Sequence, residues 1–181
     1  MNEELEALKI VTQRLNGANI AYMISGSIAA NYYTIPRMTR DIDIVIGLKE
    51  SDIDNFVGIF EKDFYVDREM IKKEVLRKGM FNLIHNQYII KIDFIVRKES
   101  EFQDVAFSRM SKVLIKGDPM WIISAEDLIL AKLLWAKDSH SEFQLKDVRN
   151  LMGTVDNLDL EYIDKWISKL NLGEIYKEVR Q

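Results

Sequence analysis

The stretch SGSIAANYYTIPRMTRDIDIVI, residues 25–46, decides the fold that this chain of 181 residues is expected to adopt. Its last six residues alternate between the two faces of a strand, so that Asp41 and Asp43 share one face and isoleucines share the other. Two carboxylates on one face lie within reach of a single cation, and they repel each other when no cation is bound. The pattern predicts a strand with one buried face and a candidate cation site opposite, the plainer alternative being two solvated aspartates.

A glycine–serine pair opens the same stretch. Gly26 and Ser27 lie where a short apolar strand, predicted over 20–24, gives way to a helix predicted over 28–33. Glycine lets a phosphate approach the backbone closely, and the free N–H groups of the helix start and the serine hydroxyl can hold its oxygens. The alternative is an ordinary helix cap after a turn glycine.

A third acid follows on a later strand. Asp93 is the only acidic residue between Ile89 and Val96, and it lies in a strand predicted over 88–96 that pairs with 80–84 in a β-hairpin. An acid inside so apolar a strand must be solvated, paired or bound to metal. The alternation also places Lys91 and Asp93 on one face of this strand.

The other segments change in character at residue 124. Before it, we expect helices over 3–15, 51–60, 67–78 and 101–108, and strands over 112–115 and 120–123 around a Gly-Asp-Pro turn. After it, helices alone are expected, over 124–137, 142–152, 160–170 and 174–179, the first of them capped by Ser124. The order predicts an α+β core over 1–123 and a C-terminal helical unit over 124–181 that packs against it.

Composition excludes several classes of protein. The 25 basic and 29 acidic residues give a net charge of −4, and 48% hydrophobic residues suffice for a core. The absence of cysteine excludes disulfides, thiolate metal sites and a cysteine nucleophile. No stretch approaches the ~20 apolar residues of a membrane span. The acidic, amphipathic start MNEELEALK does not resemble a signal peptide. The absence of cysteine fits a reducing, cytoplasmic setting.

The order Gly-Ser, Asp-x-Asp and then a lone Asp resembles the DNA polymerase β-like nucleotidyltransferase superfamily. Residues 25–46 resemble its G-S…R-x-T-x-D-I-D signature, and KIDFIV, residues 91–96, resembles the strand that carries the third acid. The 13 residues between Ser27 and Asp41 are similar to the AbiEii-type and related nucleotidyltransferase-like group.

The C-terminal half extends this resemblance. SAEDLILAKLLWA, SEFQLKDVRNLM and LDLEYIDKWISKLNL are similar to three segments of that group. One position departs: Phe143 stands where the group usually has arginine, so any phosphate or nucleic-acid contact of that arginine is lost here.

The resemblance implies a mixed β-sheet flanked by helices, and an enzyme that moves a nucleotide from a nucleoside triphosphate to an acceptor. It implies that Asp41, Asp43 and Asp93 bind Mg²⁺ or Mn²⁺, and that Asp93 can also accept the proton of the attacking hydroxyl. The expected nucleotide- and phosphate-binding residues are Gly26, Ser27, Arg37, Thr39, Arg40 and Lys132. Solvated side chains are the alternative for the two arginines.

Two residues of the helical half complete the candidate site. Lys132 is the only charge between Asp127 and Lys137, and no polar face of its helix accounts for it. It can reach a triphosphate, or it can extend along the helix to solvent. Asp147 matches an aspartate of the group and is expected to support the site by pairing with Lys132 or Lys146, or by capping a metal; a surface ion pair is the alternative.

The acceptor is left open as a protein, an RNA or a small molecule. A toxin role in a toxin–antitoxin system is one version of the enzyme hypothesis, by analogy with the group. Two other hypotheses are a nucleotide-binding module without catalysis and an antitoxin-like regulator whose helical tail binds another protein.

Overall fold

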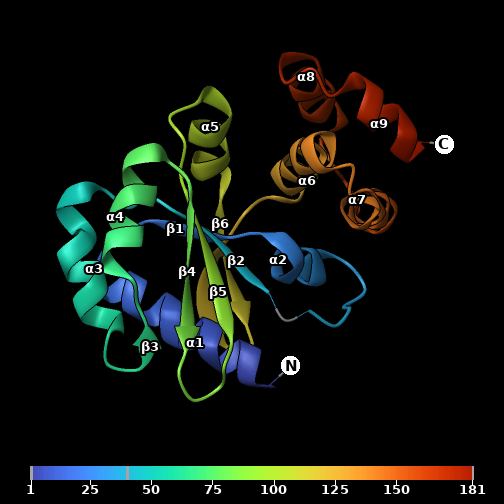
Figure 1. Cartoon of the computed structure of the whole chain (residues 1–181). Helices are drawn as coiled ribbons and strands as arrows, with labels where there is room; N and C mark the ends of the chain where they lie inside the picture. Colours follow the sequence, from blue (N-terminus) through green and yellow to red (C-terminus); the bar gives the residue numbers. More distant parts are fainter. Residues whose placement is uncertain (1, 40, 181) are drawn as a thin grey trace.

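A computed structural model describes residues 2–39 and 41–180, and a seven-stranded mixed sheet runs through it in the order β3-β4-β5-β2-β1-β7-β6 (Figure 1). β2 pairs in parallel with β5, and β1 pairs in parallel with β7; the other neighbours are antiparallel. The strands are β1 (Tyr22–Ile24), β2 (Ile42–Ile46), β3 (Phe64–Tyr65), β4 (Met80–His85), β5 (Lys91–Val96), β6 (Ser111–Ile115) and β7 (Asp118–Ile122).

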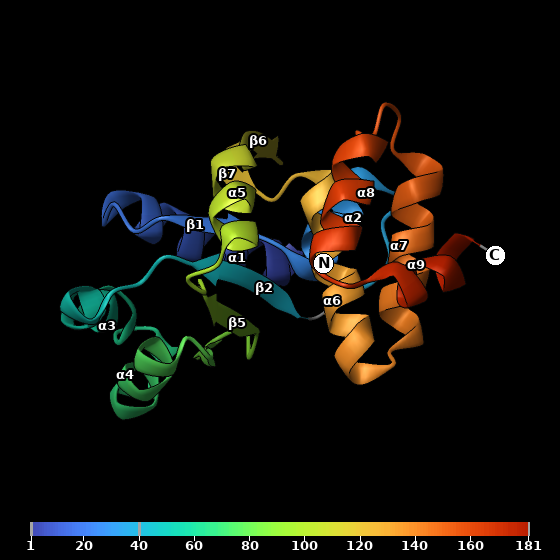
Figure 2. The same ribbon diagram turned by 90° about the horizontal axis from the view of Figure 1, so that it is seen from above.

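Helices cover both faces of this sheet. Figures 1 and 2 show α3 and α4 on one side and α2 with α6–α9 on the other. The helices are α1 (Asn2–Gly17), α2 (Gly26–Tyr33), α3 (Ile53–Phe60), α4 (Arg68–Arg77), α5 (Glu101–Arg109), α6 (Ala125–Ser139), α7 (Glu142–Thr154), α8 (Leu160–Lys169) and α9 (Gly173–Arg180), with a 3₁₀ turn η1 (Glu50–Asp52). The α+β prediction and the mixed sheet are confirmed.

The two central strands follow the predicted alternation. Ile42, Ile44 and Ile46 of β2 are fully buried, and Phe94 of β5 packs edge-on against Phe56 of α3. The apolar side chains of β2 and β5 therefore build the core on the α3 side of the sheet. The intervening side chains, which include the acids, are left on the side of α2 and α6.

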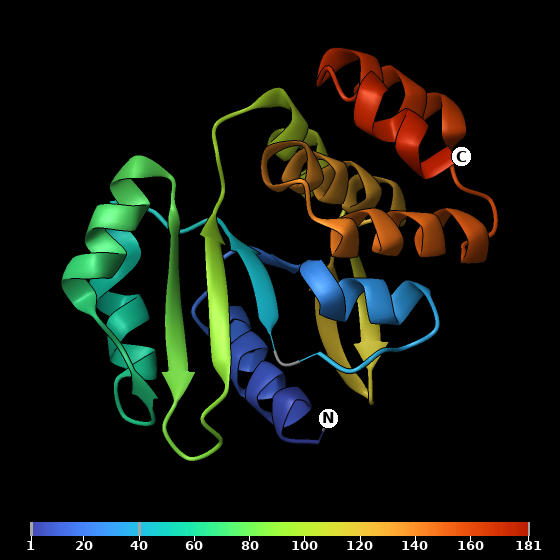
Figure 3. The ribbon, with the colours of Figure 1, turned by 45° about the vertical axis from the view of Figure 1, so that its right-hand side comes forward.

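The C-terminal residues are helical throughout, as predicted. Ser124 caps α6 by accepting a hydrogen bond from the backbone N–H of Asp127 at 3.1 Å. The buried Asp127 carboxylate in turn accepts from Arg109 of α5 at 3.1 Å and from the Tyr162 hydroxyl of α8. Figure 3 shows α8 and α9 stacked outside α6 and α7.

Two predicted boundaries are wrong, and one strand was not predicted. The helix predicted over 51–60 begins at Ile53, because residues 50–52 form the 3₁₀ turn η1. The hairpin strand begins at Lys91 rather than at residue 88, because Ile89 takes a left-handed conformation (φ 53°) in the turn. The two-residue strand β3 was not expected, since so short an edge strand leaves no alternation to detect. None of the described helices has the length and apolar character needed to cross a membrane.

Candidate active site

A pocket of about 250 Å³ opens between the sheet and α6. The sheet supplies its acidic floor from β2 and β5, the start of α2 supplies one wall, and α6 supplies the opposite wall. The lining residues are Ser25, Gly26, Ser27, Asp41, Asp43, Val45, Asp93, Ile95, Gln103, Leu128, Ala131, Lys132, Trp135 and Gln144. All three predicted acids, the glycine–serine pair and Lys132 therefore meet in one place.

The parallel pairing of β2 and β5 sets two of the acids side by side. Asp43 and Asp93 are register partners across the two strands, so their side chains project from neighbouring positions of the same face. Asp93 is buried, with 6% of its surface exposed. This register brings together acids that lie 50 positions apart in the sequence.

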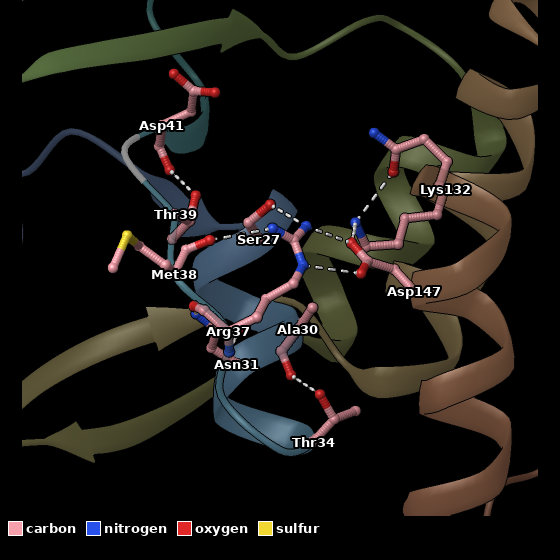
Figure 4. Close-up of polar contacts among 11 residues, drawn as sticks. Ser27, Ala30, Asn31, Thr34, Arg37, Met38, Thr39, Asp41, Lys132 and Asp147 are labelled. Carbon is pink, nitrogen blue, oxygen red and sulfur yellow. Dashed lines mark hydrogen bonds and ion pairs between the residues drawn. The ribbon is translucent and has the colours of Figure 1, made fainter. Parts of the chain in front are cut away.

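Asp41 lies just before β2 and is arranged differently. Its side chain is 66% exposed, and Figure 4 shows its carboxylate pointing away from Ser27 and Asp147. Within residues 2–39 and 41–180, no three acidic or histidine side chains lie close enough together to form a metal-ligand set. The three acids thus share a pocket without converging on one point, and their binding of metal stays a prediction.

The surroundings of Asp43 disfavour the ionised form of its carboxyl group. Burial raises the pKa of its carboxyl, and the neighbouring Asp93 and Asp41 raise it further, while Lys132 and the Ser27 backbone N–H oppose them. Negative charge is therefore under-compensated at the pocket floor. A divalent cation with a preference for oxygen ligands would remove this conflict, so the donor set fits Mg²⁺ or Mn²⁺.

Gly26 has a structural task that the sequence did not reveal. Its φ is +57°, a conformation that L side chains rarely adopt, and a Cβ built on it would lie 1.9 Å from Oδ2 of Asp43. The position must be glycine because the Asp43 carboxylate packs against its backbone. Its predicted role in holding phosphate is untested, although the start of α2 does face the pocket.

An ion-pair network connects α6 and α7 to the start of α2 (Figure 4). Asp147 of α7 accepts hydrogen bonds from Lys132 at 2.8 Å and from Arg37 at 2.9 Å. Arg37 also donates to the Ser27 hydroxyl at 2.9 Å, and Lys132 donates to Oε1 of Gln144 at 3.0 Å. The expected pairing of Asp147 with Lys132 is confirmed.

The contacts in this network decide between the alternative roles that the sequence left open for Lys132, Asp147 and Arg37. Lys132 is 3% exposed, so it does not extend to solvent, and Asp147 is buried rather than part of a surface ion pair. Although burial alone would raise the pKa of Asp147, hydrogen bonds from Arg37 and Lys132 outweigh it and lower that pKa. Arg37 is ion-paired rather than merely solvated, and it sits next to the serine that was expected to hold phosphate.

Thr39 and Arg40 are the other two loop residues that were predicted to bind phosphate. The Thr39 hydroxyl donates to the backbone carbonyl of Asp41 at 3.3 Å, and Thr39 does not line the pocket. Arg40 lies outside the residues that the structure describes, so its predicted phosphate contact is not addressed.

No site role was predicted for the pocket residues Trp135, Gln103 and Gln144. Trp135 lines the pocket with 55% of its surface exposed. Its position one turn after Lys132 on the same helix could have indicated this placement. Gln103 and Gln144 reach the pocket through tertiary packing, which no spacing in the sequence encodes.

Comparisons with known proteins were made by sequence and by structure. No family model matches the chain, and no curated protein matches its sequence. ANT(2'')-Ia, an antibiotic-resistance factor, superposes with a TM-score of 0.63 at 13% identity, covering 99% of this chain and 98% of its own. The chain has the nucleotidyltransferase fold.

Two further structures have the same fold. The lincosamide antibiotic adenylyltransferase LnuA, solved with lincomycin bound, gives a TM-score of 0.55 at 16% identity over 86% of this chain and 98% of its own. A nucleotidyltransferase-like protein from Paracoccidioides brasiliensis gives a TM-score of 0.54 at 16% identity, covering 98% of this chain and 93% of its own. These similarities confirm the resemblance to nucleotidyltransferases that the motifs indicated, at the level of the fold.

Proposed function

We propose that this protein is a metal-dependent nucleotidyltransferase that moves a nucleotide, with ATP as the favoured donor, from a nucleoside triphosphate to a hydroxyl-bearing acceptor. The register pairing of Asp43 with Asp93, in a pocket whose opposite wall carries Lys132, is the observation that carries this proposal. The carboxylates of Asp43 and Asp93 lie in the same pocket as the Lys132 ammonium, an arrangement suited to a metal-bound triphosphate.

The acids would hold the metal. Asp43 and Asp93 are adjacent, and Asp41 lies on the same pocket wall, so the three supply hard oxygen ligands from two neighbouring strands. A bound Mg²⁺ or Mn²⁺ would offset triphosphate charge and lower the pKa of an attacking hydroxyl.

The remaining residues would bind the nucleotide. The start of α2, with Gly26 and Ser27, offers backbone N–H groups and a hydroxyl to phosphate oxygens, while Lys132 and Arg37 add positive charge from beside Asp147. Asp93 would take the proton of the acceptor hydroxyl. The acceptor oxygen bonds to the α-phosphorus, the bond from that phosphorus to the β-phosphate oxygen breaks, and pyrophosphate leaves.

A small molecule is the acceptor class that the comparisons favour. LnuA is named as an adenylyltransferase of lincosamide antibiotics, and a second structure of ANT(2'')-Ia, with a TM-score of 0.62, holds adenylyl-2''-tobramycin. Protein and RNA acceptors, and a toxin–antitoxin setting, stay predictions from the sequence motifs.

Nucleotide binding without catalysis is the second candidate. The observation that favours it is the spread arrangement of the acids, since the described residues contain no converged metal-ligand set. It predicts tight nucleotide binding with no product.

One labelling experiment separates these functions. The purified protein would be incubated with α-³²P-ATP, Mg²⁺ or Mn²⁺, and in parallel tobramycin, lincomycin, RNA and cell lysate, with products resolved by chromatography. Metal-dependent label transfer that is lost in Asp43→Asn and Asp93→Asn supports the enzyme. ATP binding without transfer to any acceptor supports the binding module, and co-purification with a fixed protein without ATP binding supports the antitoxin-like regulator.

A further inference from the structure

Lys91 stands next to two of the three candidate acids, Asp41 and Asp93. It is the first residue of β5, two positions before Asp93 and on the same face. Its ammonium lies 2.7 Å from Oδ2 of Asp93 and 4.0 Å from Oδ1 of Asp41. One lysine therefore contacts two of the residues proposed to bind metal, and neither the sequence motifs nor the proposed chemistry gives it a task.

Strand register explains this placement. Because Ile42 pairs with Ile92 and Asp43 with Asp93, the positions just before them, Asp41 and Lys91, meet at the start of the same two strands. Three carboxylates and one ammonium therefore come from neighbouring positions on one face of the sheet. Lys91 and Asp93 both lie within β5, whereas Asp41 lies just before β2.

The lysine compensates for charge that would otherwise be isolated. Asp93 is buried, and an unpaired buried carboxylate is costly. Lys132, the other nearby cation, is already hydrogen-bonded to Asp147 and Gln144. The Lys91 side chain is 45% exposed, so its head group can swing into water once something else compensates the acids.

We propose that Lys91 is a tethered counter-ion of the metal site: its ammonium holds Asp41 and Asp93 while the metal is absent, and a divalent cation displaces it. This rests on the proposed function, because it takes the acids to be metal ligands. A divalent ion carries twice the charge of the ammonium and binds several carboxylates at once. At sufficient concentration it therefore displaces the ammonium from the carboxylates.

Competition between the Lys91 ammonium and a metal ion for the same carboxylates lowers the affinity of the site for metal. Each metal ion that binds must break the Lys91–Asp93 contact, so the apparent metal affinity is lower than the acids alone would give. Loss of the ammonium should therefore tighten metal binding, although it removes a favourable contact from the metal-free protein. A lysine that merely stabilised the fold would leave the affinity unchanged, and one that helped to hold the metal site together would weaken binding when removed.

The test measures Mn²⁺ binding to the full chain without nucleotide, by calorimetry. Lys91→Met should tighten binding roughly tenfold, and Lys91→Arg, which keeps the charge, should not. Lys9→Met is the matched control: Lys9 is paired with Asp118 at 3.0 Å outside the pocket, so Mn²⁺ affinity should not change. Denaturant unfolding of each variant establishes that it is folded.

A second readout follows the ammonium itself. In ¹⁵N-lysine-labelled wild type, the ammonium signal that Lys91→Met removes should move or vanish when Mg²⁺ is added, whereas the Lys9 signal should not. Unchanged or weaker Mn²⁺ binding in Lys91→Met, or a Lys91 signal indifferent to Mg²⁺ at concentrations that saturate the protein, overturns the proposal and leaves the proposed function standing. Failure of every variant to bind Mn²⁺, with or without ATP, overturns both.

Discussion

Gly26 is the residue whose replacement should disturb the site most directly. A methyl group there meets the Asp43 carboxylate at 1.9 Å, and the left-handed φ of +57° adds a backbone cost of about 1–2 kcal/mol. We expect Gly26→Ala to lower the free energy of unfolding by at least that amount and to displace Asp43.

The matched control for this prediction is Gly58→Ala. Gly58 lies inside α3, where an added Cβ has no heavy atom within 4 Å, so alanine should leave stability unchanged or raise it by roughly 0.5–1 kcal/mol. Urea unfolding of both variants measures the effect. Equal stability of Gly26→Ala and the wild type would show that the Gly26–Asp43 contact is wrongly placed.

Asp147 gives a pH-dependent prediction. Its folded-state pKa lies below the ordinary 3.8, so the ionised form contributes stability above that pH, and the contribution is lost as the pH falls below 3.8 through the folded-state pKa. At pH 7, Asp147→Asn should cost about 3 kcal/mol, because it leaves the buried Lys132 without its anion.

The measurement is denaturant unfolding of wild type and Asp147→Asn between pH 7 and pH 3. The difference in unfolding free energy should be constant down to about pH 4 and shrink below it, as the wild-type carboxyl becomes protonated. A difference that grew on acidification would contradict the sign of this pKa shift.

At the scale of elements, helices α6 and α7 are joined to each other and to α2 by one charged network. Lys132 and Asp147 are buried, whereas the third member, Arg37, is 41% exposed on its side chain. A buried ion pair can often be replaced by apolar residues of similar volume without loss of stability, while removal of one partner is costly.

We therefore expect Lys132→Met to destabilise the fold, and the double variant Lys132→Met with Asp147→Leu to recover most of that loss. Nucleotide binding should not recover, because the cation that faces the triphosphate is gone. Urea unfolding and ATP calorimetry on the same samples separate the two effects. ATP affinity that returned together with stability would show that Lys132 acts only in packing.

The alternation of polarity in β2 and β5 was enough to predict which face carries Asp43 and Asp93, because strand periodicity is a local property. The partners of Gly26 and Arg37 could not be predicted. Arg37 meets a residue 110 positions away, and Gly26 meets Asp43 only because α2 folds back over β2. Such contacts arise from tertiary packing, which no pattern along the chain records.

At the scale of the whole molecule, the C-terminal helices complete the pocket that the sheet begins. β2 and β5 provide the acids, and α6 provides Lys132 and Trp135 across the pocket. Asp127 links α6 to α5 and α8 through Arg109 and Tyr162, so the outer helices hold α6 in place. The proposed division at residue 123 is thus one of sequence pattern, and the proposed activity requires both parts.

The most direct test of the central claim is calorimetry of ATP binding, with and without Mg²⁺, to the wild type and to the double variant Asp43→Asn with Asp93→Asn. Paired acids opposite Lys132 predict that the wild type binds ATP far more tightly with Mg²⁺, and that the double variant loses this gain while staying folded. Equal Mg²⁺-dependent affinity in both proteins would contradict the assignment of the pocket as a metal-dependent nucleotide site.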